Sequence, residues 1–200
     1  MATTVITGPF SLERVVNAVE KVRQRLLRAA EALRQANILY AVAGGNAVAL
    51  WVSRVDETAV RNTQDVDILV RRADLPAIKI ALQQAGFVYR HTAGLDAFLD
   101  GPGATPREAV HLVFANEKVR PEESLANPDV TEAQENPGGP AVRVISLHDL
   151  VQIKLTAFRD KDRTHLRDLI EVGLITTDWP GKFPTILGQR LWQLLNTPGG

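Results

Sequence analysis

Two aspartates stand two positions apart at the start of an apolar run, Asp65-Val66-Asp67-Ile68-Leu69-Val70. On a β-strand, residues two apart point to the same face, so the two carboxylates would project side by side. Carboxylates held that close repel each other unless a cation lies between them. Hard oxygen ligands favour Mg²⁺ or Mn²⁺, and Mg²⁺ usually completes its shell with substrate phosphates. The alternative is an edge strand whose two aspartates simply meet water.

A pair of adjacent glycines, Gly44 and Gly45, follows the apolar run Ile38 to Ala43 and precedes a helical pattern from Asn46 to Trp51. Glycines allow backbone amides to approach a ligand closely, and the N-terminus of a helix carries partial positive charge. Together these features predict a phosphate site, with Asn46 as a candidate helix cap. The alternative is a tight turn that binds nothing.

The two motifs are more informative together, because about twenty residues separate the glycine turn from the aspartate strand. If the strands that carry them are neighbours, the turn and both carboxylates face one pocket. Such a pocket suits transfer of a nucleotidyl group, in which metal ions clamp a triphosphate and align the attacking oxygen. The polar segment from Val55 to Gln64 is predicted to be the connecting loop.

The remaining patterns predict an α/β (α+β) protein, with a mixed β-sheet flanked by helices and a C-terminal helical segment. A long amphipathic helix begins after Ser11, and its apolar residues recur from Leu12 to Leu33. Further helices are expected over Asp74 to Ala85, Ser146 to Phe158, Asp162 to Val172 and Leu187 to Leu195, and further strands over Phe87 to His91, Ala97 to Leu99, Ala109 to Phe114 and Arg143 to Ile145.

The segment from Asn127 to Pro140 is rich in proline and glycine and is predicted to be a loop. It divides the chain into a predicted nucleotide-site core at residues 1–140, which includes the long N-terminal helix, and a part at residues 141–200. The strand and helices of that second part are expected to pack on the core.

The composition is that of an ordinary globular protein, with 200 residues of which 45% are hydrophobic. Lys and Arg together number 23, as do Asp and Glu, so the net charge gives no argument for a nucleic-acid or membrane partner. The absence of cysteine excludes disulfides, Cys-zinc sites and thiol catalysis. Residues 1–10 lack a secretory signal pattern, and no segment approaches the roughly 20 apolar residues that span a bilayer. We therefore expect a cytoplasmic protein.

These motifs, in this order, resemble the nucleotidyltransferase (polymerase-beta-like) superfamily, and look closest to its small stand-alone branch of abortive-infection toxins. The resemblance is carried by Ala43-Gly44-Gly45-Asn46-Ala47 with Leu50, Arg61-x-Thr63-x-Asp65-x-Asp67-Ile68-Leu69, Ile145-Ser146-Leu147-x-x-Leu150-x-x-x-Lys154-x-x-Ala157, and the run from Arg159-Asp160-Lys161-Asp162 to Asp168-Leu169.

The resemblance implies a role for each matching residue. The nucleotide would be bound by Gly44, Gly45, Asn46 and Thr63, and Mg²⁺ or Mn²⁺ by Asp65 and Asp67. Lys154, on a helix, would face the nucleotide or its phosphates. Without the family pattern, a lysine at that position is expected to snorkel beside an apolar helix face.

The resemblance also implies a third carboxylate on a later strand, where this chain has His111. A neutral histidine can act as a general base or ligate a softer metal, and it can equally mark a site that binds nucleotide without turnover. Asp96 and Asp100 lie on a neighbouring predicted strand and are candidates to reach the site. His165, one helical turn from Asp168, is expected to be an exposed helix residue.

Two functions follow as hypotheses. The first is an enzyme that moves a nucleoside monophosphate from an NTP to an acceptor hydroxyl on RNA, a protein or a small molecule, with Asp65, Asp67 and His111 as its catalytic residues. A toxin with an antitoxin-like protein partner is one version of it. The second is a catalytically degenerate module that binds a nucleotide or a protein partner without turnover.

Overall fold

A seven-stranded mixed sheet runs through the computed structural model, which describes residues 11–136 and 141–197. The order of the strands is β3-β4-β5-β2-β1-β7-β6. The central strand, β2, is antiparallel to β1 and parallel to β5. The strands are β1 (Tyr40–Ala43), β2 (Val66–Val70), β3 (Val88–Thr92), β4 (Leu95–Leu99), β5 (Ala109–Phe114), β6 (Gln134–Glu135) and β7 (Arg143–Val144). The predicted mixed sheet is confirmed.

The sequence of β2 explains its central place. Val66, Ile68 and Leu69 are fully buried, so the strand has no apolar side chain that faces water. A strand that is buried on both faces must have neighbours on both edges and helices on both sides. Its one polar position, Asp67, lies at the end of the strand that faces the glycine turn.

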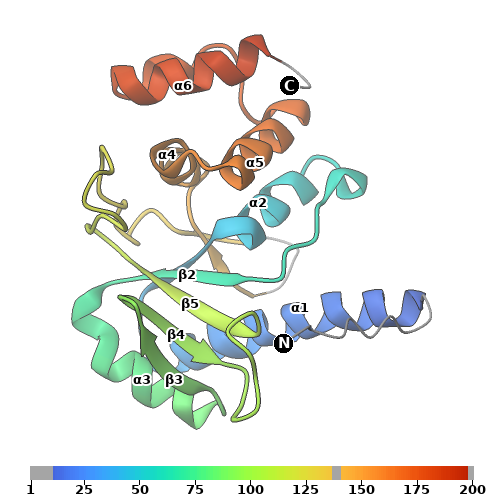
Figure 1. Cartoon of the computed structure of the whole chain (residues 1–200), viewed down its shortest axis with the longest axis vertical. Helices are drawn as coiled ribbons and strands as arrows, with labels where there is room; N and C mark the ends of the chain where they lie inside the picture. Colours follow the sequence, from blue (N-terminus) through green and yellow to red (C-terminus); the bar gives the residue numbers. More distant parts are fainter. Residues whose placement is uncertain (1–10, 137–140, 198–200) are drawn as a thin grey trace, which may run out of the picture.

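Helices cover both faces of this sheet (Figure 1). On one side lie α2 (Gly44–Ser53), α4 (Leu147–Ala157) and α5 (Asp160–Glu171), and on the other lie α1 (Leu12–Gln35) and α3 (Leu75–Gln84). The last helix, α6 (Thr185–Asn196), packs outside α4 and α5. Three short 3₁₀-helices complete the described elements, η1 (Glu57–Ala59), η2 (Arg72–Asp74) and η3 (Trp179–Lys182).

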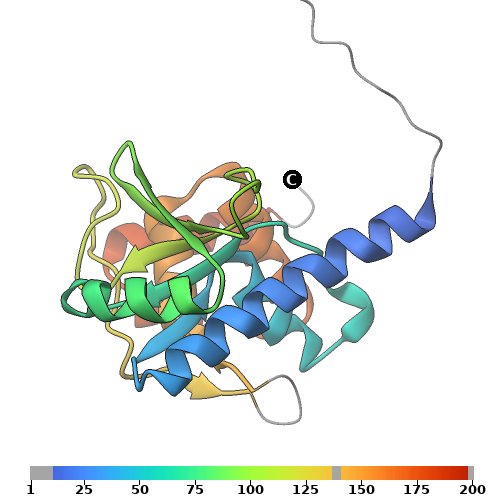
Figure 2. The same ribbon diagram turned by 90° about the horizontal axis from the view of Figure 1, so that it is seen from below.

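Only the second half of α1 is covered by the sheet. Leu26 and Leu33 are buried, whereas Leu12 is 70% exposed and Val16 is 59% exposed. Figure 2 shows the first turns of α1, in dark blue, extending past the rest of the described chain. Ser11 precedes the helix as expected, but its side chain makes no capping hydrogen bond. The apolar stripe therefore belongs to the core only from its middle onward.

Three helix starts differ from the prediction, among them that of α6, which begins at Thr185, two residues before the predicted Leu187. α2 begins at Gly44, so Asn46 is inside the first turn and does not cap the helix. α5 begins at Asp160, two residues before the predicted start at Asp162. The cause is local, because the Asp162 carboxylate accepts a hydrogen bond from the backbone amide of Arg159 at 3.2 Å and so closes an extra turn.

The predicted loop from Asn127 to Pro140 contains the short strand β6, which pairs antiparallel with β7. The predicted boundary at residue 140 lies outside the described residues. β7 pairs parallel with β1, so the strand after the boundary joins the same sheet as the strands before it. Among the helices that the structure describes, none has the length and apolarity needed to cross a membrane.

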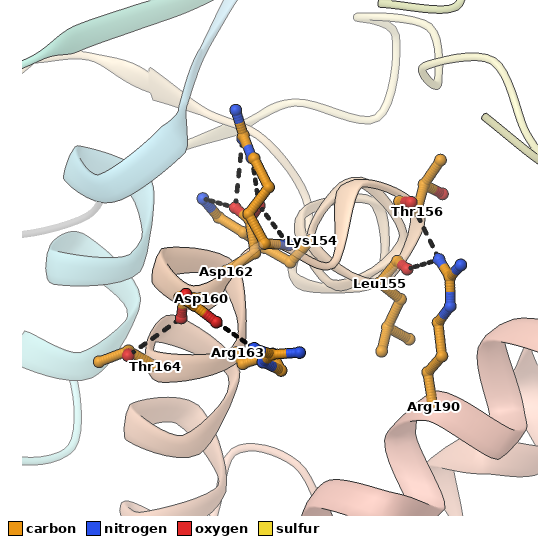
Figure 3. Close-up of polar contacts among 9 residues, drawn as sticks. Lys154, Leu155, Thr156, Asp160, Asp162, Arg163, Thr164 and Arg190 are labelled. Atoms are coloured by element: carbon orange, nitrogen blue, oxygen red, sulfur yellow. Dashed lines mark hydrogen bonds and ion pairs between the residues drawn. The ribbon is translucent and has the colours of Figure 1, made fainter. Parts of the chain in front are cut away.

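Specific contacts hold both ends of α4, the helix that carries Lys154. At its start the Ser146 hydroxyl accepts a hydrogen bond from the Asp149 amide at 3.1 Å, as the sequence predicts. At its end the Arg190 guanidinium, from α6, donates to the carbonyls of Leu155 and Thr156 at 2.6 and 2.9 Å (Figure 3). These contacts satisfy backbone groups that a helix end leaves without partners, and they fix the position of α4.

Candidate active site

Main-chain pairing brings the glycine turn to Asp67, one of the two predicted metal ligands. β1 and β2 are neighbours, and their register sets Ala43 opposite Asp67. Gly44 follows with a φ of +62°, in the left-handed region that favours glycine. A Cβ atom on Gly44 would lie 1.9 Å from Asp67 Oδ2. Glycine at this position therefore lets the turn and the carboxylate occupy adjacent space.

The second glycine makes a similar approach to Thr63. A Cβ atom on Gly45 would lie 2.8 Å from Thr63 Oγ1. Both glycines are in the first turn of α2, whose leading amide groups have no partner within the helix and can bind an anion. Asn46 has a different place, because its Nδ2 donates to the carbonyl of Asp65 at 2.6 Å and ties α2 to the start of β2.

His111 lies beside Asp67, because β5 runs parallel to β2 and the register pairs the two residues. His111 Nδ1 is 3.8 Å from Asp67 Oδ1, and the two side chains are 31% and 25% exposed. Burial tends to raise the pKa of Asp67, but its interaction with His111 and the charges of Lys154 and Lys161 outweigh burial and lower the pKa. The interaction with Asp67 raises the pKa of His111 against the effect of burial, and the charge of Asp65 adds to it.

Asp96 on β4 and Asp100, directly after that strand, do not replace the missing carboxylate. Asp96 lines the cavity, but its carboxylate accepts from the Tyr89 hydroxyl at 2.5 Å and lies 2.9 Å from His91 Nδ1. Asp100 pairs with two arginines of α1, of which Arg25 is 3.1 Å away, and it is not among the cavity-lining residues. His111 is therefore the side chain that stands where the resemblance implies a third acid.

A buried ion pair joins α4 and α5 beside the cavity, which Lys154 lines. Lys154 on α4 and Asp162 on α5 point toward each other, and Lys154 Nζ lies 3.1 Å from Asp162 Oδ1 (Figure 3). Their side chains are 5% and 1% exposed, and Asp162 also accepts from Arg159 Nε at 2.7 Å. Burial lowers the pKa of Lys154 despite Asp162. Burial acts to raise the pKa of Asp162, but Arg159 and Lys154 outweigh it and the pKa is lowered. The snorkelling alternative for Lys154 is wrong.

Several other residues line the cavity although nothing in the sequence pattern singles them out as site residues. Lys161, in the first turn of α5, and Lys118 and Arg120, in the loop after β5, line the cavity and add positive charge. His165 was expected to be exposed, yet it lines the cavity, and its buried Nδ1 has no hydrogen-bond partner among the described residues. Burial lowers the pKa of His165 to about 4, so the ring is neutral at pH 7.

A single cavity of about 470 Å³ joins these groups. Its size is in the range of sites for small organic ligands. The predicted site residues that line it are Gly44, Gly45, Thr63, Asp65, Asp67, His111 and Lys154. Asn46 is the predicted nucleotide-binding residue that is absent from this lining, since its side chain is turned toward the start of β2.

Comparison with known proteins gives matches to solved structures. No protein-family model matches the chain, and no curated protein sequence matches it significantly. The solved structure of an antigenic nucleotidyltransferase-like protein from Paracoccidioides brasiliensis does match, with a TM-score of 0.59 and 22% identity over 88% of each chain. The chain has the nucleotidyltransferase fold. At this level of identity the likeness shows the fold and leaves the activity open.

Two further solved structures with looser superpositions also match. The antibiotic-resistance factor ANT(2'')-Ia has a TM-score of 0.43 and 15% identity, over 94% of this chain and 85% of its own. JHP933 from Helicobacter pylori has a TM-score of 0.48 and 16% identity, over 94% of this chain and 76% of its own. Matches this loose do not bear on the function of the present protein.

The nucleotidyltransferase fold raises the question of a divalent metal ion, and the residues present fit one that arrives with its substrate. The described part of the chain has no group of three or more His, Asp or Glu side chains arranged to hold a metal. Asp65 and Asp67 nevertheless line one cavity, and Asp67 lies against the turn at Gly44. Mg²⁺ commonly binds one or two carboxylates and takes its other ligands from water and substrate phosphates.

Proposed function

We propose that this protein is a metal-dependent nucleotidyltransferase, which moves a nucleoside monophosphate from an NTP to an acceptor hydroxyl. The observation that supports the proposal most is the contact between the turn at Gly44 and the carboxylate of Asp67, inside a cavity that Lys154 also lines. A turn able to bind phosphate, two acids and a buried cation are groups that such a transfer uses, and Gly44, Asp65, Asp67 and Lys154 line one cavity.

Each group has a distinct part in this proposal. The amides of Gly44 and Gly45 would bind phosphate oxygens at the start of α2, with Thr63 beside them. Asp65 and Asp67 would hold Mg²⁺ or Mn²⁺, which when bound neutralises triphosphate charge and polarises the reacting phosphate. Lys154, which Asp162 holds in place, would add a fixed positive charge to the cavity.

The reaction itself needs an aligned acceptor and a route for one proton. The acceptor oxygen bonds to the α-phosphorus, the bond to the β-phosphate oxygen breaks, and pyrophosphate leaves. His111 lies next to Asp67 and would orient the acceptor hydroxyl and take its proton. The acceptor is RNA, a protein side chain or a small molecule. The toxin role, the antitoxin-like partner and the cytoplasmic location stay predictions.

One observation favours a second candidate, a module that binds nucleotide without turnover. Asp67 has a histidine at 3.8 Å where the family resemblance implies another acid. A site with two carboxylates holds a metal less firmly than a site with three, since each carboxylate adds negative charge and a ligand. In this reading the turn and Lys154 bind the triphosphate, and the protein acts through a partner.

Transfer of a labelled nucleotide distinguishes the two candidates. The purified chain is incubated with α-labelled NTPs and Mg²⁺ or Mn²⁺, together with total RNA, a protein mixture or an aminoglycoside. We expect labelled acceptor in the wild type and none in Asp67→Asn, while Asp74→Asn, outside the cavity, serves as the matched control. Nucleotide binding without transfer under either metal would instead establish the binding module.

A further inference from the structure

Arg72 lines the cavity beyond the C-terminal end of β2, whereas Asp67 lies near the start of that strand, and the contacts of Arg72 are not those of a phosphate-binding arginine. It comes from η2, and its Cζ lies 3.6 Å from the centroid of the Phe114 ring at the end of β5. Phe114 is 7% exposed. One face of the guanidinium therefore rests on a buried aromatic ring.

Carboxylates already occupy the edge of this guanidinium. Its Nε and Nη2 donate to the two carboxylate oxygens of Glu117, each at 2.6 Å, and its Nη1 lies 3.7 Å from Asp96 Oδ2. Arginine binds a phosphate through the same in-plane fork of N–H groups. Because Glu117 takes that fork and two negative charges lie beside it, Arg72 is poorly suited to hold a phosphate.

The second face of the guanidinium remains available. The Arg72 side chain is 50% exposed and lines the cavity, although one face and one edge are covered. Two apolar side chains line the same cavity and are open to solvent, Leu95 at 60% and Val119 at 56% exposure. A fixed planar cation with exposed apolar groups in the same cavity suits a flat aromatic ligand.

We propose that Arg72 is a stacking platform for a nucleobase, with Phe114 behind it and Leu95 and Val119 as apolar walls. Guanidinium planes stack on nucleobases, and each of the bases offers a π-face for such stacking. The base belongs either to the donor NTP or to a nucleic-acid acceptor, which share this chemistry. The proposal rests on the proposed function for the presence of a nucleotide, but it concerns binding and does not require turnover.

Calorimetric titration with three probes tests the platform. The probes are ATP, inorganic triphosphate and a short single-stranded RNA. Arg72→Lys keeps the positive charge and removes the planar guanidinium. It should therefore weaken the binding of ATP or of the RNA about tenfold, while inorganic triphosphate binds as before. Arg72→Trp restores a flat face without the charge and should recover the lost affinity.

Arg71→Lys is the matched control. Arg71 is the adjacent residue and has a similar two-pronged contact, with its Nε and Nη2 at 3.0 and 3.1 Å from Asp129, but it does not line the cavity. Its replacement should change no binding constant. Thermal melting of each variant shows whether the fold is kept.

The outcomes separate the two sources of the base and the two proposals. A loss for ATP places the donor base on Arg72, and a loss for RNA alone places an acceptor base there. Equal losses for ATP and inorganic triphosphate, or no loss for any probe, overturn the platform. Base-dependent binding without nucleotide transfer refutes the transferase and leaves the platform standing, whereas a wild type that binds none of the probes overturns both.

Discussion

Replacing Gly44 with alanine tests whether the turn must lie against Asp67. The φ of +62° at Gly44 costs an L-residue about 1–2 kcal/mol. The added Cβ would lie 1.9 Å from Asp67 Oδ2, whereas ordinary contact begins at 3.4 Å. The carboxylate or the turn must therefore move by about 1.5 Å, which is the difference between 3.4 and 1.9 Å.

A displacement of this size matters far more for catalysis than for folding. Misplacing a reacting group by about 1 Å costs about 100-fold in rate, so transfer by Gly44→Ala should fall by at least about that factor. A stability loss of about 1–2 kcal/mol should lower the melting temperature by about 2–8 °C in a chain of this size. The measurements are initial rates of transfer with labelled NTP and thermal denaturation, on the same preparations.

Gly86→Ala supplies the control. Gly86 also has a positive φ, of +87°, but a Cβ there meets nothing within 4 Å. It should therefore show a similar loss of stability without the loss of activity. If the two variants have the same transfer rate relative to wild type, the contact between the turn and Asp67 does not control the chemistry, and the central argument for this site fails.

Two further predictions concern buried charge. Burial lowers the folded pKa of His165 to about 4 against an ordinary value of 6.5, so the unfolded chain binds the extra proton between these values. The free energy of unfolding is therefore unaffected by this titration above about pH 6.5 and decreases as the pH falls toward 4, by up to about 3 kcal/mol. Urea melts of His165→Gln should show a weaker decline in this free energy than wild type over that range. Equal slopes in the two proteins would contradict the burial argument. Asp162→Asn should lower the free energy of unfolding by about 3 kcal/mol, because it leaves Lys154 buried beside a neutral partner. Glu31→Gln, which breaks an exposed pair with Arg34, should leave the urea midpoint unchanged, and a similar loss in both variants would refute the burial argument.

Local patterns in the sequence were enough to predict the framework of the site. Alternation of apolar and acidic residues marked β2, and the glycine pair marked the turn after β1, although α2 begins at Gly44 and not at the predicted Asn46. Asp67 lies on β2, whereas Asp65 directly precedes the strand, so the predicted sharing of one strand face is not seen, although both residues line the cavity. Ser146 also caps α4 as expected, because capping involves residues only three positions apart.

Contacts between distant segments were beyond these patterns. His165 looks like an exposed helix residue, and only the packing of α5 beside the cavity buries its ring. Arg72 lies 45 positions from Glu117, the residue that fixes its plane. Asparagine is a residue type that often caps helices, but the side-chain amide of Asn46 instead donates to the carbonyl of Asp65, which only the folded position of β2 brings within reach.

The periodicity of α1 shows the same limit in another way. Recurrence of apolar residues from Leu12 to Leu33 identifies the face of the helix that can be buried, and Leu26 and Leu33 are buried. It carries no information on how far the sheet extends beneath the helix. Leu12 and Val16 continue the stripe and remain exposed because the covering elements end before them.

The backbone ladder between β1 and β2 has a consequence for how the site tolerates change. Ala43 and Asp67 are opposite each other through main-chain hydrogen bonds, so the distance between turn and acid does not depend on the length of chain that joins them. We therefore expect changes of length around η1, near Glu57, to leave this contact in place. A single residue inserted within β2 would turn Asp67 to the other face of the sheet, because side chains alternate along a strand.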